Sequence, residues 1–144
     1  MDFLKTNLDL LVISVLGVMS FLMLWVVIER VIYFKRVELS RFSHPDELNI
    51  GLTRNLTILY SVGANAPYIG LLGTVIGILI TFHDLGQGGT VDVNTIMLGL
   101  ALALKATAMG LFVAIPAITF YNGLLRKVDV LTALWRKEYG CEAV

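Results

Sequence analysis

Long stretches without a charged residue limit most strongly how this chain can fold. Residues 10–28 form an uncharged run of 19, and a second uncharged run of 28 residues separates Arg54 from His83. An α-helix of about 20 residues spans a hydrocarbon layer of about 30 Å, because each residue adds about 1.5 Å along the axis. A helix also satisfies its own backbone hydrogen bonds inside lipid. We therefore expect an all-α membrane protein.

The composition favours the same class. The 144 residues are 57% hydrophobic and only 15% charged, and their mean hydropathy is +0.81, which is too apolar for a soluble domain of this length. Eleven basic and eleven acidic residues cancel, so no overall charge indicates a nucleic-acid partner. The start of the chain carries Asp2, Lys5 and Asp9 and has no small-residue cleavage pattern. We therefore expect no cleaved signal peptide.

Three membrane spans are predicted within one membrane domain over 1–144. Pro67 marks the point where a more polar lead-in gives way to the second span, and the glycine-rich, acidic stretch after His83 has no apolar periodicity, which is typical of a turn. The expected parts are a first span at about 9–32, a cytoplasmic segment at 33–57, a second span at about 63–83, an outer loop at 84–94, a third span at about 95–125 and a tail at 126–144.

The basic residues predict the direction of the spans. They flank the spans on one side only, namely Lys35, Arg36, Arg41 and Arg54 before the second span and Arg126, Lys127, Arg136 and Lys137 after the third. Cytoplasmic segments carry such an excess, so the N-terminus and the 84–94 loop are expected in the periplasm. The 33–57 segment is expected to be mostly helical, with Ser43 and Asp46 at a break or cap, and too short to bury a core of its own.

Small residues form a stripe on the second span and again on the third. The spacing i, i+4, i+7, i+11 places each set on one helix face, and such faces let membrane helices approach closely. The stripes are Gly70, Thr74, Gly77 and Thr81, then Ala103, Thr107, Gly110 and Ala114, with Gly73 adding a further small residue four before Gly77.

Two interpretations of these stripes stay open. The stripes can pack against each other within one chain, with the threonines bonded to carbonyls of their own helices. Alternatively, Thr74 and Thr107 line a surface shared with a second chain, or a wet path, at similar depth. Pro116 frees a backbone carbonyl that neighbours or water must satisfy, which favours a crowded bundle around it. Because one chain can hardly cover all these faces, we expect a homo-oligomer.

Two motifs of the later spans resemble a known family. "APYIGLLGTVIGILITF" (66–82) and "ALKATAMGLFVAIPAITFYN" (103–122), preceded by "VVIERVIYFKR" (26–36), are similar to the signature of the ExbB, TolQ and MotA family of inner-membrane energising proteins, and to ExbB in particular. MotA-like proteins have four spans, which disfavours the flagellar version.

The resemblance implies a function and partners. ExbB-like proteins form a ring, typically a pentamer, around the membrane helices of ExbD, and the complex uses the proton gradient to drive TonB-dependent transport of iron chelates, cobalamin or similar nutrients across the outer membrane. Thr74 and Thr107 match the family's two pore-facing threonines. No cofactor is implied, and no catalytic constellation in the sequence indicates an enzyme. A TolQ-like subunit of the Tol-Pal envelope system and a non-conducting scaffold remain alternatives.

The chain departs from the family pattern at two places. Many relatives have a glutamate five residues before the second threonine, where this chain has Leu102. The titrating carboxylate is therefore expected from the partner, whose membrane helix carries an aspartate in this family. The segment between the first two spans is also much shorter than in the larger relatives.

Lys105 is a charge inside the third span, where lysine costs about 2.5–3.5 kcal/mol at a helix centre. One interpretation is that its stem carries the ammonium outward, or that it pairs at a subunit boundary, with Asp84 or Asp92 as the acid. The other is a role close to the ion pathway.

The remaining polar candidates receive structural interpretations. Glu29 and Arg30 are expected to anchor the end of the first span among lipid headgroups and to pair there. His44 and His83 have no second ligand at metal spacing, so we expect no metal site. Cys141 is the chain's one cysteine and is assigned no function.

Overall fold

The computed structural model describes residues 2–87 and 92–140, which form helices and short connections. The helices are α1 (Asp2–Arg36), the short 3-10 helix η1 (Leu39–Arg41), α2 (Pro45–Thr53), α3 (Leu56–Gln87) and α4 (Val93–Tyr139). Three of them, α1, α3 and α4, are long and apolar enough to cross a membrane. The predicted all-α chain with three such helices is confirmed over the described residues.

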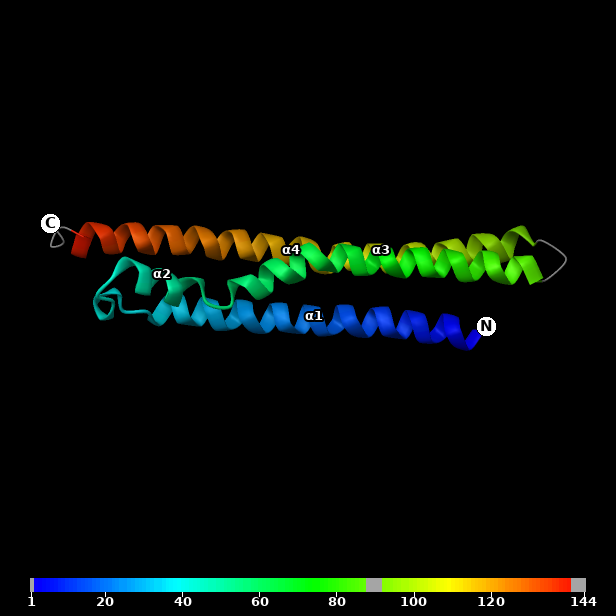
Figure 1. The fold of residues 1–144 in the computed structure, drawn as a ribbon, viewed down its shortest axis with the longest axis horizontal. Helices are drawn as coiled ribbons and strands as arrows, with labels where there is room; N and C mark the ends of the chain where they lie inside the picture. The colour runs from blue at the N-terminus through cyan, green and yellow to red at the C-terminus, as the bar shows by residue number, and fades with distance from the viewer. Residues whose placement is uncertain (1, 88–91, 141–144) are drawn as a thin grey trace.

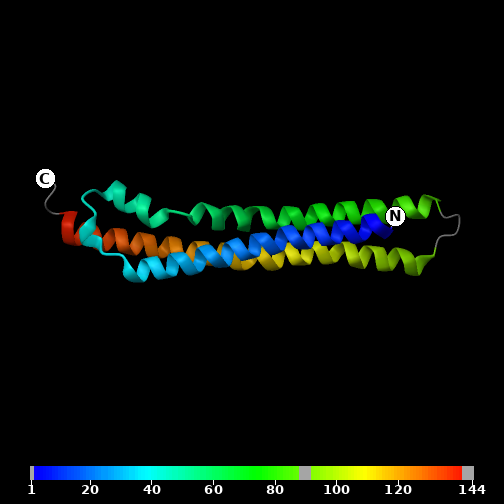
Figure 2. The same ribbon diagram turned by 90° about the horizontal axis from the view of Figure 1, so that it is seen from below.

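The three long helices lie side by side in an elongated bundle (Figures 1 and 2). α3 and α4 form an antiparallel hairpin, and α1 packs along both of them. We call the end where α3 stops and α4 starts the hairpin end. At the opposite end, which we call the polar end, α2 packs against the last part of α4.

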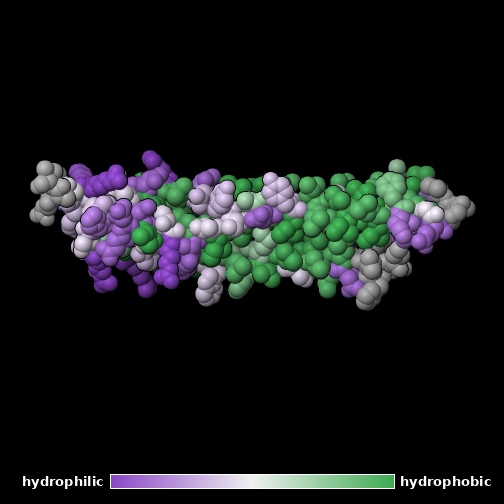
Figure 3. Space-filling view, in the orientation of Figure 1, coloured by the Kyte–Doolittle hydropathy of each residue, from purple (hydrophilic) through white to green (hydrophobic). Residues whose placement is uncertain are grey.

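The surface is divided along the bundle axis. Hydrophobic residues cover the middle and the hairpin half, whereas hydrophilic residues gather mainly around the polar end (Figure 3). At 47 residues, α4 is about 70 Å long, more than twice a hydrocarbon core of about 30 Å. The last turns of α4 therefore lie outside the apolar band, beside α2.

The helix that contains the second span begins well before Pro67. α3 runs without interruption from Leu56 through Pro67. Proline removes one backbone N–H donor, and the remaining backbone hydrogen bonds hold the helix together. The chain turns instead at Asn55, whose φ of 65° is in the left-handed region. Asparagine tolerates that conformation better than most residues.

The 33–57 segment is helical in part, as η1 and α2, and it joins a core at the polar end. The predicted break is present at Ser43, which lies between η1 and α2. The N-cap position of α2 is His44, without a capping side-chain hydrogen bond, and Pro45 opens the helix, so neither Ser43 nor Asp46 is the cap. Leu48 and Leu52 are fully buried, in one cluster with Trp135 of α4. The segment thus completes a core with the ends of α1 and α4, although it has none of its own.

Candidate functional site

The backbones of α3 and α4 touch where the two small-residue stripes meet. A Cβ added at Gly70 would lie 2.7 Å from the Ala106 carbonyl oxygen, and one at Gly110 would lie 2.6 Å from the Ala66 carbonyl oxygen. Both distances are shorter than any relaxed contact and involve backbone atoms. About two turns further toward the hairpin end, Gly77 faces Ala103, at 3.0 Å from the added Cβ to the alanine Cβ. The stripes therefore pack against each other within one chain.

Thr74 and Thr107 meet in this α3–α4 seam and are hydrogen-bonded to each other. The Thr74 Oγ1 also lies 3.1 Å from the Ala103 carbonyl oxygen and 3.2 Å from that of Gly70. The Thr107 Oγ1 lies 3.4 Å from the Gly70 carbonyl oxygen. Thr74 is buried and Thr107 is half-buried, so the pair is open on the Thr107 side only.

The hydroxyl pair can hold two arrangements of hydrogens. A hydroxyl donates one hydrogen and accepts through its oxygen, and two backbone carbonyls lie within reach as acceptors. Thr107 can donate to Thr74, which then donates to a carbonyl, or Thr74 can donate to Thr107, which then donates to Gly70. The seam is therefore a neutral, low-dielectric site whose hydrogen-bond direction can reverse.

The other small residues predicted on these faces support the seam. Thr81 is buried, donates to the Gly77 carbonyl at 2.9 Å and packs on Gly99. α4 continues through Pro116, and Ala114 and Ala117 beside it are 2% and 0% exposed. The proline is thus flanked by crowded positions.

A second polar cluster surrounds Arg30, two turns before α1 ends. Its guanidinium binds the Glu29 carboxylate through Nε, at 3.0 Å, and through Nη2. The Nη1 donates to the Gly51 carbonyl at 3.1 Å, and the Cζ lies 4.6 Å from the centre of the Tyr33 ring. The Asn55 side chain donates to the same Glu29 carboxylate at 3.1 Å. The cluster therefore ties α1 to the break between α2 and α3.

Only 2% of the Arg30 side chain is exposed, so its guanidinium contacts protein groups, and the anchoring of Glu29 and Arg30 at headgroup level stays a prediction. The predicted pairing with Glu29 is present, but α1 continues beyond both residues to Arg36. The partners Gly51 and Asn55 come from an irregular segment, and hydrophobic periodicity gives no signal for them. The asparagine directly after Arg54, at the first position of the second uncharged run, was the available hint.

Lys105 lies outside the seam. Its side chain is exposed, and it has no hydrogen bond or ion pair with any described residue. Asp92, one of the two acids proposed for it, instead caps α4 by accepting from the backbone N of Asn94 at 3.1 Å and from the Thr95 hydroxyl at 2.9 Å. The Thr95 hydrogen bond, then that of Asn94, hold the pKa of Asp92 below its usual range. The other acid, Asp84, lies 3.9 Å from the Nδ1 of His83.

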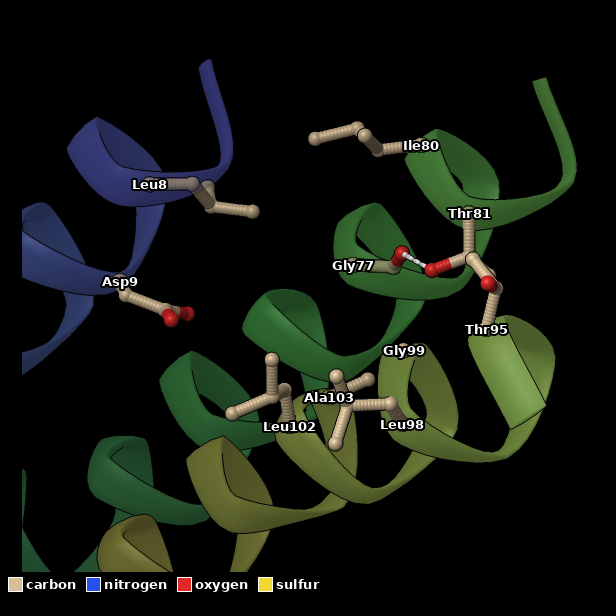
Figure 4. A pocket seen from close by; sticks show the side chains of 10 residues that line it. All are labelled: Leu8, Asp9, Gly77, Ile80, Thr81, Thr95, Leu98, Gly99, Leu102 and Ala103. Atoms are coloured by element: carbon tan, nitrogen blue, oxygen red, sulfur yellow. Dashed lines mark hydrogen bonds between the residues drawn. The ribbon is translucent and has the colours of Figure 1, made fainter. Parts of the chain in front are cut away.

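A hollow of about 240 Å³ lies between the three long helices near the hairpin end (Figure 4). Leu8 of α1, Ile80 of α3 and Leu98 and Leu102 of α4 make most of it apolar, and Asp9, Thr81 and Thr95 add polar atoms. The Asp9 carboxylate points from α1 toward Leu102 (Figure 4). The sequence indicated Asp9 only as one of the charges that argue against a signal peptide, and this position was missed.

No three His, Cys, Asp or Glu side chains gather as a metal site within residues 2–87 and 92–140. Cys141 lies outside the described residues.

Comparison with known proteins identifies the family. The MotA/TolQ/ExbB proton channel family matches residues 43–137, which include the whole α3–α4 seam. The chain belongs to this family. It is 57% identical over 136 residues to "Biopolymer transport protein ExbB" of Helicobacter pylori strain J99, covering 94% of each chain. It is 45% identical over 140 residues to the ExbB of Aquifex aeolicus, covering 97% of this chain and 95% of that one.

A similarity to TolQ is also present but is shorter. The chain is 39% identical over 105 residues to "Tol-Pal system protein TolQ" of Pseudomonas aeruginosa, which covers 73% of this chain and only 43% of TolQ. The chain is thus a membrane protein of a transport and proton-channel family, and its length is close to that of the two ExbB relatives above.

Proposed function

We propose that this chain is an ExbB-like subunit of an inner-membrane complex driven by the proton-motive force. With an ExbD-like partner it powers a TonB-like protein and hence transport across the outer membrane. The observation that carries the proposal is the 57% identity to an ExbB over 94% of both chains. The function follows from a likeness along the whole length of the chain and does not rest on one shared motif.

The proposed orientation places the polar end in the cytoplasm and the hairpin end in the periplasm. The basic residues of the 33–57 segment and of the tail after 125 support it, because such residues gather on the cytoplasmic side. The gathering of hydrophilic surface around the polar end is in keeping with it. The spans and loops then follow the single membrane domain predicted from the sequence.

The proposed proton pathway passes the Thr74–Thr107 pair in a homo-oligomeric ring. Neighbouring chains enclose the partner's membrane helix, and its aspartate comes opposite the half-buried Thr107. The seam has no acid of its own, so a carboxylate there is poorly solvated, and burial of that kind raises a carboxylate pKa toward values at which it can take up a proton. Protonation changes the attraction between partner and ring, and this permits a step of motion.

Proton flux in vesicles tests the proposal. Vesicles carrying the chain together with its ExbD-like partner are expected to acidify under an imposed potential, and vesicles carrying either protein alone are not. Equal, negligible flux in all three preparations, with the complex intact, would favour a non-conducting scaffold.

A TolQ-like role is the second candidate, favoured by the 39% identity to TolQ. Complementation separates the two. Expression in a host lacking ExbB is expected to restore uptake of an iron chelate, whereas expression in a host lacking TolQ is expected to leave its envelope defect in place. The reverse pattern would assign the chain to the Tol-Pal system.

A further inference from the structure

Two charged side chains of opposite sign lie alone in the apolar part of the bundle. Among the described residues of 7–28, 56–82 and 93–125, Asp9 and Lys105 are the only Asp, Glu, Lys or Arg. Neither has a hydrogen bond or an ion pair with another described residue. Charges at such positions are disfavoured in hydrocarbon unless they find a counter-charge or water.

The two residues lie at nearly the same level of the bundle. A Cβ added at Gly73 would lie 3.1 Å from Val12 and 2.9 Å from the Ala106 Cβ, so Val12 and Ala106 share one level. Asp9 precedes Val12 by three residues, about 4.5 Å toward the hairpin end, and Lys105 precedes Ala106 by one, about 1.5 Å in the same direction. Their levels therefore differ by about 3 Å.

They also lie on the same side of the bundle. The Asp9 carboxylate points toward Leu102 of α4 across the hollow (Figure 4). Lys105 follows Leu102 by three residues, which places it about one turn further along and about 60° around the helix. It is about 160° away from Thr107 and the seam. Lys105 thus stands beside the face that α4 turns toward α1, and its flexible four-carbon stem can swing toward that face.

We propose that Asp9 and Lys105 of one chain form an ion pair that bridges α1 and α4 inside the membrane. The pair neutralises both charges and closes one side of the hollow between the three helices. It fixes the first turns of α1 on α4, while the Arg30 cluster fixes the other end of the same helix. This role does not depend on the proposed function, and it assigns Lys105 to structure and not to the ion pathway.

A double-mutant cycle on the purified complex in mild detergent tests the coupling. Asp9→Asn and Lys105→Met are each expected to lower the thermal midpoint by roughly 5 °C, because each leaves the other charge uncompensated. The double variant is expected to be at least as stable as either single variant, since no lone charge remains. Asp129→Asn, an exposed acid at the polar end, is the control and should change little. Additive losses in the double variant would overturn the proposal.

Cysteine cross-linking tests which chain supplies each partner. In a Cys141→Ser background, chains carrying both Asp9→Cys and Lys105→Cys are expected to be bridged within one chain by a short bis-maleimide, which adds one thiol across each of its two double bonds, so the product keeps the mass of a single chain plus the linker. Complexes mixed from Asp9→Cys chains and Lys105→Cys chains are expected to give no cross-linked dimer. A dimer from the mixed complexes would place the pair between neighbouring chains and would contradict the proposal, as would free thiols in the doubly substituted chain.

Discussion

At the scale of single residues, the Thr74 and Thr107 hydroxyls are bonded to each other where two helix backbones touch. Each hydroxyl can also reach a carbonyl of the opposite helix, Thr74 that of Ala103 and Thr107 that of Gly70. Hydrogen bonds between membrane helices contribute about 0.6 kcal/mol on average. Loss of one hydroxyl thus changes the stability little, but it removes one of the two groups whose hydrogen-bond direction can reverse.

Thr107→Val is therefore expected to separate assembly from activity. The Thr74 hydroxyl keeps its carbonyl acceptors, so the thermal stability of the complex should fall by only about 0.6 kcal/mol, while TonB-dependent uptake should fall several-fold. Thr107→Ser retains the hydroxyl and serves as the control, with uptake near wild type. A loss of uptake that only follows a loss of assembled complex would assign the threonine to packing alone.

A second prediction for a single residue concerns Arg30. Arg30→Lys keeps the charge but cannot span both Glu29 oxygens and the Gly51 carbonyl, because an ammonium lacks the planar fork of a guanidinium. We expect a loss of about 1.5–3 kcal/mol in unfolding free energy, measured by denaturation in detergent. The control is Arg41→Lys, whose pair with Glu38 is 78% and 63% exposed and contributes about 0–1 kcal/mol. Equal effects of the two substitutions would mean that burial of Arg30 has no energetic consequence.

The residues that the sequence could and could not predict differ in their physical origin. Spacing alone predicts which small residues share a face, because a helix converts i, i+4, i+7 into one face, but it left open whether the two faces meet within one chain. Spacing does not predict the contacts of Arg30, because Gly51 and Asn55 reach it only after the chain turns through a left-handed Asn55. The position of Asp9 over Leu102 depends on how α1 lies on α4, which is a tertiary relation that no single span encodes.

At the scale of helices, the α3–α4 hairpin is held by backbone contact, and side chains cannot adjust to relieve an added atom there. Gly110→Ala would place a methyl group 2.6 Å from the Ala66 carbonyl oxygen and 3.1 Å from the Gly70 Cα. The helices would have to move apart, at a cost of about 1–3 kcal/mol. We expect a lower thermal midpoint and loss of the Thr74–Thr107 bond. Gly123→Ala on the same helix, with no atom within 4 Å of the added Cβ, should be neutral or slightly stabilising; equal destabilisation by both would argue against the seam.

The start of α4 depends on the Asp92 cap. Hydrogen bonds lower the pKa of Asp92 in the folded state, so its carboxylate stabilises the helix end above the ordinary pKa, and this contribution is lost as pH falls through the lowered value. Hydrogen exchange of the first turn of α4 should be faster in Asp92→Ala than in wild type at neutral pH, and the difference should shrink in acid. Asp92→Asn keeps an acceptor that does not titrate and should be less sensitive to acid; an unchanged difference in acid would contradict the cap.

Helix class and number were predictable because the uncharged runs are long enough to span lipid. The starting point of α3 was not, because Pro67 is tolerated within that helix and the true break depends on Asn55. The burial of Leu48 and Leu52 was also missed, since a nine-residue helix buries its apolar side only when the ends of α1 and α4 are already in place.

At the scale of the whole molecule, large apolar side chains are exposed in two different settings. Within the apolar band, residues such as Phe112, 79% exposed, can be covered by lipid. Val130 and Leu134, 45% and 48% exposed on one face of α4, lie beyond the band, as does Ile50 of α2, which is 72% exposed. Water disfavours such surface, so another protein chain is the fitting cover at the polar end.

We therefore expect a homo-oligomer whose contacts include the polar end of α4. The native mass in mild detergent should be a multiple of the mass of one chain.

Leu134→Glu should weaken that assembly at least tenfold, because covering a leucine contributes about 1.5–3 kcal/mol and burying a carboxylate opposes it. Circular dichroism should show that the helices persist in the dissociated chains. Ser40→Glu adds the same charge at an exposed position of η1 and should leave the mass unchanged. A wild-type protein that stays monomeric with its helices intact would refute the ring. An oligomer whose mass is unchanged by Leu134→Glu would show that its contacts lie within the membrane.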